Sequence, residues 1–265
     1  MWIDTHCHFD AEEFEADREQ VLVRAVQAGV EAIVVPGYAA RHWERLFRVC
    51  GGSDLPRLYA APGLHPCYIH EHQFEHLVQL AALLQSRSCI AIGEIGLDTY
   101  VTDLKDPEVY RKQQQYFTEQ LRLAKDRDMP VILHVRKAHA DVFRILKSVG
   151  FSGPGIVHAF SGGIEEARHY VRMGFRLGIG GSLTYGQAKR LHEVVRAMPL
   201  ETLVIETDAP DMIPSSFRRG GGHCRNSPEY LPAVAEALAA VKGVSLARLA
   251  EQLKENSRDS LRLFH

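Results

Sequence analysis

Short apolar runs alternate with longer amphipathic stretches along the whole chain. Eight of the apolar runs are typical of buried parallel strands, because several are rich in β-branched residues and stop at Gly, Pro or His. The pattern predicts strands over residues 2–4, 32–36, 58–62, 90–93, 131–134, 155–158, 175–179 and 203–206.

The stretches between these runs have the spacing of helices that pack on one face. In 108–127, for example, Tyr116, Leu121, Leu123 and Ala124 stand among charged residues. The same pattern predicts helices over 12–28, 72–85, 108–127, 138–149, 164–173, 187–197, 228–241 and 245–263.

Strands that alternate with helices over this length predict an α/β fold of the (β/α)8 barrel type, in which catalytic sites lie at the C-terminal ends of the strands. A doubly wound open sheet is the alternative. That fold typically carries GxGxxG after its first strand, whereas this chain has His6, Cys7 and His8 there. Because no linker, repeat or change of composition divides the sequence, we expect one domain over 1–265.

The composition is that of a soluble globular protein, with 46% hydrophobic and 24% charged residues. This balance excludes disordered and low-complexity classes. The net charge of −2 provides no overall positive field that would attract nucleic acid. A polyanionic substrate would therefore depend on local cations or bound metal.

The five cysteines are scattered and form no CxxC pair, so neither a disulfide framework nor a thiolate zinc site is indicated. The N-terminus lacks a basic region followed by an apolar one, and no apolar run approaches the roughly 18 residues of a membrane helix. We expect a cytoplasmic protein that needs no membrane and no obligate protein partner.

The histidines carry the chemical signal. His6 and His8 share one face of an extended strand with Asp4, while Cys7 points the other way. Two imidazoles spaced in this way can chelate one metal ion, although a pair of polar surface histidines has the same spacing.

The other strands end in similar residues. Glu94 follows the apolar run 90–93, His134 and His158 end two further strands, and Glu206 and Asp208 lie two residues apart at the last one. A barrel gathers these ends around one rim. Six of these side chains are more ligands than one tetrahedral ion needs: His6, His8, Glu94, His134, His158 and Asp208.

Such a set suits two metal ions about 3.5–4 Å apart that share a carboxylate, an arrangement used to hydrolyse phosphorus and carbonyl substrates. Glu94 is the natural bridge, because its two oxygens have the required reach. Imidazole-rich sites favour Zn, Mn, Fe or Ni over an all-oxygen Mg site. The identity of the two divalent ions stays open, with Zn, Mn, Mg and Ni as candidates.

Seven motifs, in order along the chain, resemble those of the TatD family of metal-dependent hydrolases within the amidohydrolase-like barrels. They are Ile3-Asp4-Thr5-His6-Cys7-His8, Gly63-Leu64-His65-Pro66, Gly93-Glu94-Ile95-Gly96-Leu97-Asp98, Gln113-x-x-x-Phe117-x-x-Gln120-Leu121, His134-Val135-Arg136-Lys137-Ala138, His158-Ala159-Phe160-Ser161-Gly162 and Glu206-Thr207-Asp208-Ala209-Pro210. The resemblance implies a (β/α)8 barrel and a metal-dependent nuclease that removes nucleotides from DNA ends.

The resemblance also divides the ligands between the two ions: His6, His8 and Asp208 for one, His134 and His158 for the other, and Glu94 between them. Asp208 would be the catalytic residue that orients a metal-activated water and accepts its proton. His65 is implied as a substrate-binding or ligand-supporting residue, or else a structural turn histidine. Arg136 would contact a phosphate, unless it is a solvated residue of the next helix.

Several roles stay open. Glu206 could tune Asp208, hold a further ion or serve as a buried structural acid; Asp98 could support a ligand or cap a loop, and we favour the cap. The loop from Arg218 to Arg225, with Arg219, could neutralise a nucleic-acid backbone or be a solvated connection, which we favour.

One motif departs from the family pattern: Arg-Asn-Glu-Pro is replaced by Arg225-Asn226-Ser227-Pro228, which removes an acid. The replaced residue belongs to the last substrate loop and not to the metal centre, so the departure bears on the substrate alone. The sequence supports a nuclease first, and a metal-dependent hydrolase of amides or esters, including aminoacyl esters, as the alternative. A non-catalytic metal-binding scaffold is disfavoured, because all six ligands and a proton acceptor are present.

Overall fold

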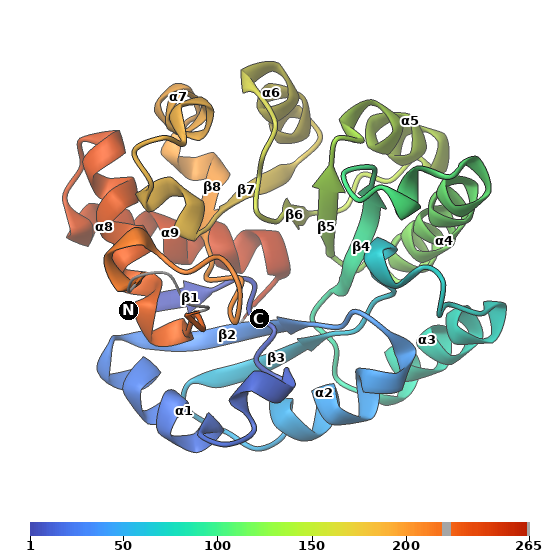
Figure 1. Cartoon of the computed structure of the whole chain (residues 1–265), viewed down its shortest axis with the longest axis horizontal. Coiled ribbons are helices and arrows are strands. Elements are labelled where there is room, and N and C mark those ends of the chain that lie inside the picture. Colours follow the sequence, from blue (N-terminus) through green and yellow to red (C-terminus); the bar gives the residue numbers. More distant parts are fainter. Residues whose placement is uncertain (219–223, 264–265) are drawn as a thin grey trace.

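The computed structural model describes residues 1–218 and 224–263. Eight parallel strands surround a common centre, and the helices lie outside them (Figure 1). The strands are β1 Trp2–Asp4, β2 Val30–Pro36, β3 Arg57–Ala61, β4 Ile92–Asp98, β5 Val131–Arg136, β6 Gly155–Val157, β7 Phe175–Ile179 and β8 Leu203–Ile205.

The strands form two hydrogen-bonded sheets, β1-β2-β3 and β4-β5-β6-β7-β8. Backbone hydrogen bonds join these two sheets at both of their edges. Between β3 and β4, the Ile90 amide donates to the Ala60 carbonyl at 3.0 Å. Between β8 and β1, the Thr5 amide donates to the Ile205 carbonyl at 3.1 Å. The sheet is thus closed on itself as the predicted (β/α)8 barrel.

The helices of the described residues are α1 Arg18–Gln27, α2 Trp43–Cys50, α3 Phe74–Ser86, α4 Pro107–Asp126, α5 His139–Val149, α6 Ile164–Arg172, α7 Lys189–Ala197, α8 Leu231–Lys242 and α9 Leu246–Leu261. The predicted helix 12–28 is divided into a 3-10 turn, Glu12–Phe14, and α1. The sequence pattern missed α2, a short helix that buries Trp43 and Leu46. Across 1–218 and 224–263, none of the helices combines the length and the apolar character needed to cross a membrane.

The fourth strand is longer than predicted. The apolar run ends at 93, but β4 continues from Ile92 to Asp98 with all its residues buried. Its two glycines and two acids do not resemble a buried strand in sequence. Gly96 has φ +147°, and a Cβ there would lie 2.0 Å from the His134 carbonyl oxygen, so only glycine permits this close approach to β5. Glu94 therefore lies inside a strand, and not directly after one as predicted.

Aliphatic side chains fill the barrel interior beneath its C-terminal mouth and support the polar side chains that lie there. Ile132, Ile156 and Val204 belong to one buried cluster contributed by several strands. Side chains alternate along a strand, so the residues two positions further on, including His134 and His158, lie on the same inward face. The apolar core thus fixes the direction in which the histidines project.

Candidate metal centre

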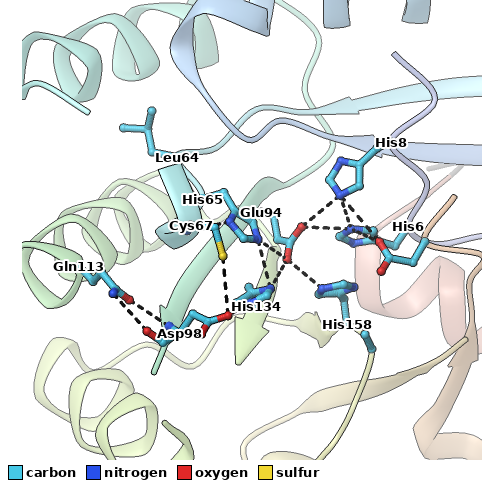
Figure 2. Close-up of polar contacts among 12 residues, drawn as sticks. His6, His8, Leu64, His65, Cys67, Glu94, Asp98, Gln113, His134 and His158 are labelled. Carbon is cyan, nitrogen blue, oxygen red and sulfur yellow. Dashed lines mark hydrogen bonds and ion pairs between the residues drawn. The ribbon is translucent and has the colours of Figure 1, made fainter. Parts of the chain in front are cut away.

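The other five predicted ligands lie around Glu94 at the C-terminal mouth of the barrel, and Figure 2 shows four of them, His6, His8, His134 and His158. Glu94 is almost completely buried, with 1% of its surface exposed. Its two carboxylate oxygens face different groups of side chains.

The first group faces Glu94 Oε2. His6 Nε2 lies 3.1 Å and His8 Nε2 3.5 Å from this oxygen. Asp208 Oδ1 completes the group, 3.5 Å from His6 Nε2 and 3.8 Å from His8 Nε2. The first and last strands of the barrel therefore supply one set of converging nitrogen and oxygen atoms.

The second group faces Glu94 Oε1. His134 Nδ1 lies 2.7 Å and His158 Nε2 2.8 Å from this oxygen. His65 joins them, with its Nε2 2.9 Å from Glu94 Oε1 and 3.1 Å from His134 Nδ1. The position of Glu94 between the two groups is the geometry of a bridging carboxylate.

Both groups fit divalent metal ions. Within each, the potential ligand atoms lie within 4.8 Å of one another, in the sets His6, His8, Asp208 and Glu94, His134, His158. Glu94 Oε2 is buried without a hydrogen-bond partner in the described residues, and the Nε2 atoms of His6 and His8 face it. Buried polar atoms normally have partners, so this oxygen supports a bound cation. Imidazole and carboxylate together suit Zn, Mn or Ni.

Two further carboxylates contact the outer nitrogens of the second group. His134 Nε2 lies 2.9 Å from Asp98 Oδ2, and His158 Nδ1 lies 3.5 Å from Glu206 Oε1. The Ala159 amide also donates to Glu206 Oε1, at 2.5 Å. Carboxylates in this position fix the ring orientation of a metal-ligating histidine. Glu206 thus contacts His158 directly.

Asp98 has both of the roles that were left open. While Oδ2 contacts His134, its Oδ1 accepts a hydrogen bond from the Tyr100 amide at 2.6 Å. The Val101 amide donates to the same Oδ1 at 3.3 Å. The favoured cap is present, and so is the support of a candidate ligand.

The surroundings shift the pKa values of Glu94 and Asp208 in opposite directions. Burial would raise the pKa of Glu94, but His158, His65 and His6 lower it well below its ordinary value. Burial raises the pKa of Asp208 to about 6, against the opposing influence of His158 and His8. In the metal-free protein Asp208 is therefore the more basic of these two carboxylates.

The backbone at Asp208 also has an unusual conformation. Its φ of +54° lies in the left-handed region, three residues after the end of β8. Asp adopts this region more readily than most residues do, because its short polar side chain can bond locally. The Asn226 side chain donates to the Thr207 carbonyl at 2.8 Å, and the Asn226 amide donates to the Pro210 carbonyl at 2.8 Å. The segment around Asn226 therefore holds the chain on both sides of Asp208.

His65 combines the two alternatives raised from sequence. Its Nδ1 accepts a hydrogen bond from the Cys67 amide at 3.0 Å, which caps the 3-10 turn Pro66–Tyr68. Its Nε2 faces Glu94 and His134, as described above. The turn therefore carries His65 into the centre.

A cleft of about 330 Å³ opens above the two groups. Arg136 is exposed at its edge, with its guanidinium 4.1 Å from the centre of the Tyr100 ring. Tyr38 and Tyr68 also line the cleft, with ring centroids 5.0 Å apart. Tyr38 was not predicted, because no motif marks it, although it lies two residues after β2 and strand ends form the mouth of a barrel.

Arg225, the last residue of the predicted basic loop, already has partners within the described residues. Arg225 forms an ion pair with Asp17 at 2.6 Å, and its guanidinium lies 4.6 Å from the centre of the Phe14 ring. The suggestion that Arg225 neutralises a nucleic-acid backbone is therefore not supported by its contacts. Arg218 is exposed, and Arg219 lies outside the described residues. Ser227, which stands where the family acid is missing, is buried.

Replacing Asp98 with alanine should weaken metal binding about 10–100-fold, because His134 loses the partner that orients its ring. Titration of the metal-free protein with Zn²⁺ or Mn²⁺ measures the effect. Asp103→Ala is the matched control, since Asp103 is an exposed acid that lies five residues after Asp98, in the 3-10 turn Asp103–Lys105. Equal affinities for Asp98→Ala and the control would show that Asp98 acts only as a cap.

Comparison with known proteins gives a consistent family assignment. Residues 3–262 match the family described as TatD related DNase. The chain is 38% identical over 258 residues to an Escherichia coli K12 protein named uncharacterized metal-dependent hydrolase YjjV, covering 97% of this chain and 96% of that protein. A Pantoea vagans protein named 3'-5' ssDNA/RNA exonuclease TatD is 30% identical, covering 98% of this chain and 99% of its own.

The structural comparison agrees. The crystal structure of the Escherichia coli homologue YjjV superposes with a TM-score of 0.90 at 38% identity, over 99% of this chain and 98% of that one. This likeness confirms the predicted barrel. The chain belongs to the TatD-related family of metal-dependent hydrolases.

Proposed function

We propose that the protein is a metal-dependent nuclease that hydrolyses phosphodiester bonds at DNA ends. The observation that carries this proposal is the position of Glu94 between two ligand groups, below a cleft with Arg136 at its edge. Paired metal sites that share a carboxylate are typical of phosphodiester hydrolysis. Residues 1–265 would act as one domain.

Two divalent ions would be held by the residues around Glu94. His6, His8 and Asp208 would bind one ion, and His134 and His158 the other, with Glu94 between them. Ions bound there would acidify a water molecule and polarise a phosphoryl oxygen. Zn, Mn, Mg and Ni remain the candidates.

Asp208 would orient the attacking water and accept its proton. It lies at the mouth of the barrel with 9% of its surface exposed, so it is accessible from the cleft. A carboxylate in this position can accept a proton from a water molecule that reaches it from the cleft. Arg136 would neutralise a phosphate oxygen of the bound strand, and His65 would contact the substrate or hold Glu94 and His134 in place.

Two features support a nucleic-acid substrate. The Pantoea vagans relative carries the name of an ssDNA/RNA exonuclease. The cleft also combines a cation at Arg136 with aromatic rings at Tyr38 and Tyr68, and such rings stack on unpaired bases. One feature favours the alternative substrate class: Ser227 replaces the acid of the family motif, which leaves room for an amide or ester hydrolase.

End-labelled single-stranded DNA should lose nucleotides when Mg²⁺, Mn²⁺ or Zn²⁺ is added to the metal-free protein, and a chelator should stop the release. Salt should weaken the reaction only slightly, because few cationic side chains line the cleft and the net charge is −2. Gel analysis of the labelled products measures both effects. Cleavage of an aminoacyl or simple carboxyl ester, with DNA left intact under every metal, would replace the nuclease proposal with the alternative.

A further inference from the structure

A second cavity adjoins the candidate metal centre, on the side of the barrel where β7 and α7 lie (Figure 1). We call this cavity of about 640 Å³ the side chamber. It shares His134, His158, Asp208 and Arg136 with the cleft, so the two spaces meet at the centre. A substrate whose reacting group lies at the metal centre can therefore extend into the side chamber.

The walls of the side chamber are largely apolar. Phe160, Leu191 and Met212 line it, with Ala188 at the start of α7. The ring of Phe160 depends on its neighbour: a Cβ on Gly162 would lie 2.6 Å from Phe160 Cζ, so glycine leaves room for the ring in this wall. The volume falls within the roughly 300–1,000 Å³ of sites that bind small molecules.

Polar side chains also line the side chamber. Ser182 and Gln187 provide a hydroxyl and an amide in the lining, and the amide can both donate and accept hydrogen bonds. Charged side chains also line the side chamber: Lys189 and Arg190 at the start of α7, and Asp211 beside Met212.

A nucleotide has three matching parts: a flat apolar face, a polar edge and an anionic phosphate. We infer that the side chamber is a nucleoside subsite, which takes the base of the terminal nucleotide while its phosphate lies at the metal centre. The inference rests on the proposed nuclease function and adds to it that the terminal base contributes to binding. Phe160, Leu191 and Met212 would contact the base, and Gln187 its edge.

The test uses single-stranded oligonucleotides whose terminal nucleotide carries a base or is abasic, prepared separately for the 3′ and the 5′ end. Contacts to one base contribute on the order of tenfold in affinity. The wild-type protein should therefore show a KM about tenfold higher for an abasic end, with a similar kcat. Ala188→Phe should fill the side chamber, raise the KM of the base-bearing substrate and bring the ratio of the two KM values close to one.

Arg196→Ala is the matched control, because Arg196 is an exposed residue near the other end of α7, and it should keep the wild-type ratio. Gln187→Ala provides a second variant in which only an exposed side chain is shortened, and its ratio should fall about threefold. A variant that is merely less stable would change the kinetic constants of both substrates equally and keep the ratio of the two KM values.

The possible results separate the inference from the proposed function. Equal KM values for abasic and base-bearing ends in the wild-type protein would overturn the subsite and leave the nuclease function standing. An unchanged ratio in both Ala188→Phe and Gln187→Ala would do the same. If the wild-type protein cleaves no nucleic acid with any metal, the proposed function falls, and the subsite falls with it.

Discussion

Glu94→Ala should abolish stable metal binding at both ligand groups and reduce hydrolysis to background. The reason is that each of its oxygens faces one group, with His6 Nε2 3.1 Å from Oε2 and His134 Nδ1 2.7 Å from Oε1. Removal of this carboxylate leaves several imidazoles together without the anion that balances them. Elemental analysis after metal loading measures the loss of stoichiometry.

A thermal readout makes the result independent of activity. Metal at about 100 times its Kd stabilises the native state by about 2.7 kcal/mol per site, which raises Tm by several degrees in a protein of this size. The wild-type protein should show this shift and Glu94→Ala should not. Glu165→Ala, at an exposed acid of α6 paired with Arg168, should behave as the wild type does. Full stoichiometry and an undiminished shift in Glu94→Ala would refute the bridging role.

The fold could be predicted because hydrophobic burial dominates it. Buried parallel strands are nearly continuous apolar runs, so most of the predicted strands agree with the structure within one or two residues. The exceptions have local causes. In β4, Glu94, Gly96 and Asp98 interrupt the apolar run, and the strand is held by close packing against β5 that composition does not reveal.

The convergence of the candidate ligands could also be expected from sequence, because a barrel brings all strand ends to one rim. The contacts that orient these ligands could not be expected from the sequence. Whether Asp98 meets His134, or Glu206 meets His158, depends on side-chain directions across neighbouring strands. The ion pair of Arg225 could not be expected for the same reason, since its partner Asp17 is distant in the sequence.

Asp208→Asn separates the role of a ligand from that of a base. Asparagine has nearly the same shape and still offers a carbonyl oxygen, but it does not accept a proton near neutral pH. The variant should keep most of the bound metal and lose on the order of a hundredfold or more in turnover. His134→Ala should instead lose metal occupancy and recover some activity at high metal concentration, because His134 contacts Glu94 and not the proposed water.

Metal content and turnover measured together on both variants decide between these roles. Asp208 lines the cleft, so its carboxylate is accessible to a water molecule and to the substrate. Near-normal turnover in fully metallated Asp208→Asn would exclude Asp208 as the proton acceptor. The acceptor would then have to be sought at Glu206, which is completely buried and already accepts a hydrogen bond from the Ala159 amide. Those contacts make Glu206 the weaker candidate, and so the Asp208→Asn variant is the decisive one.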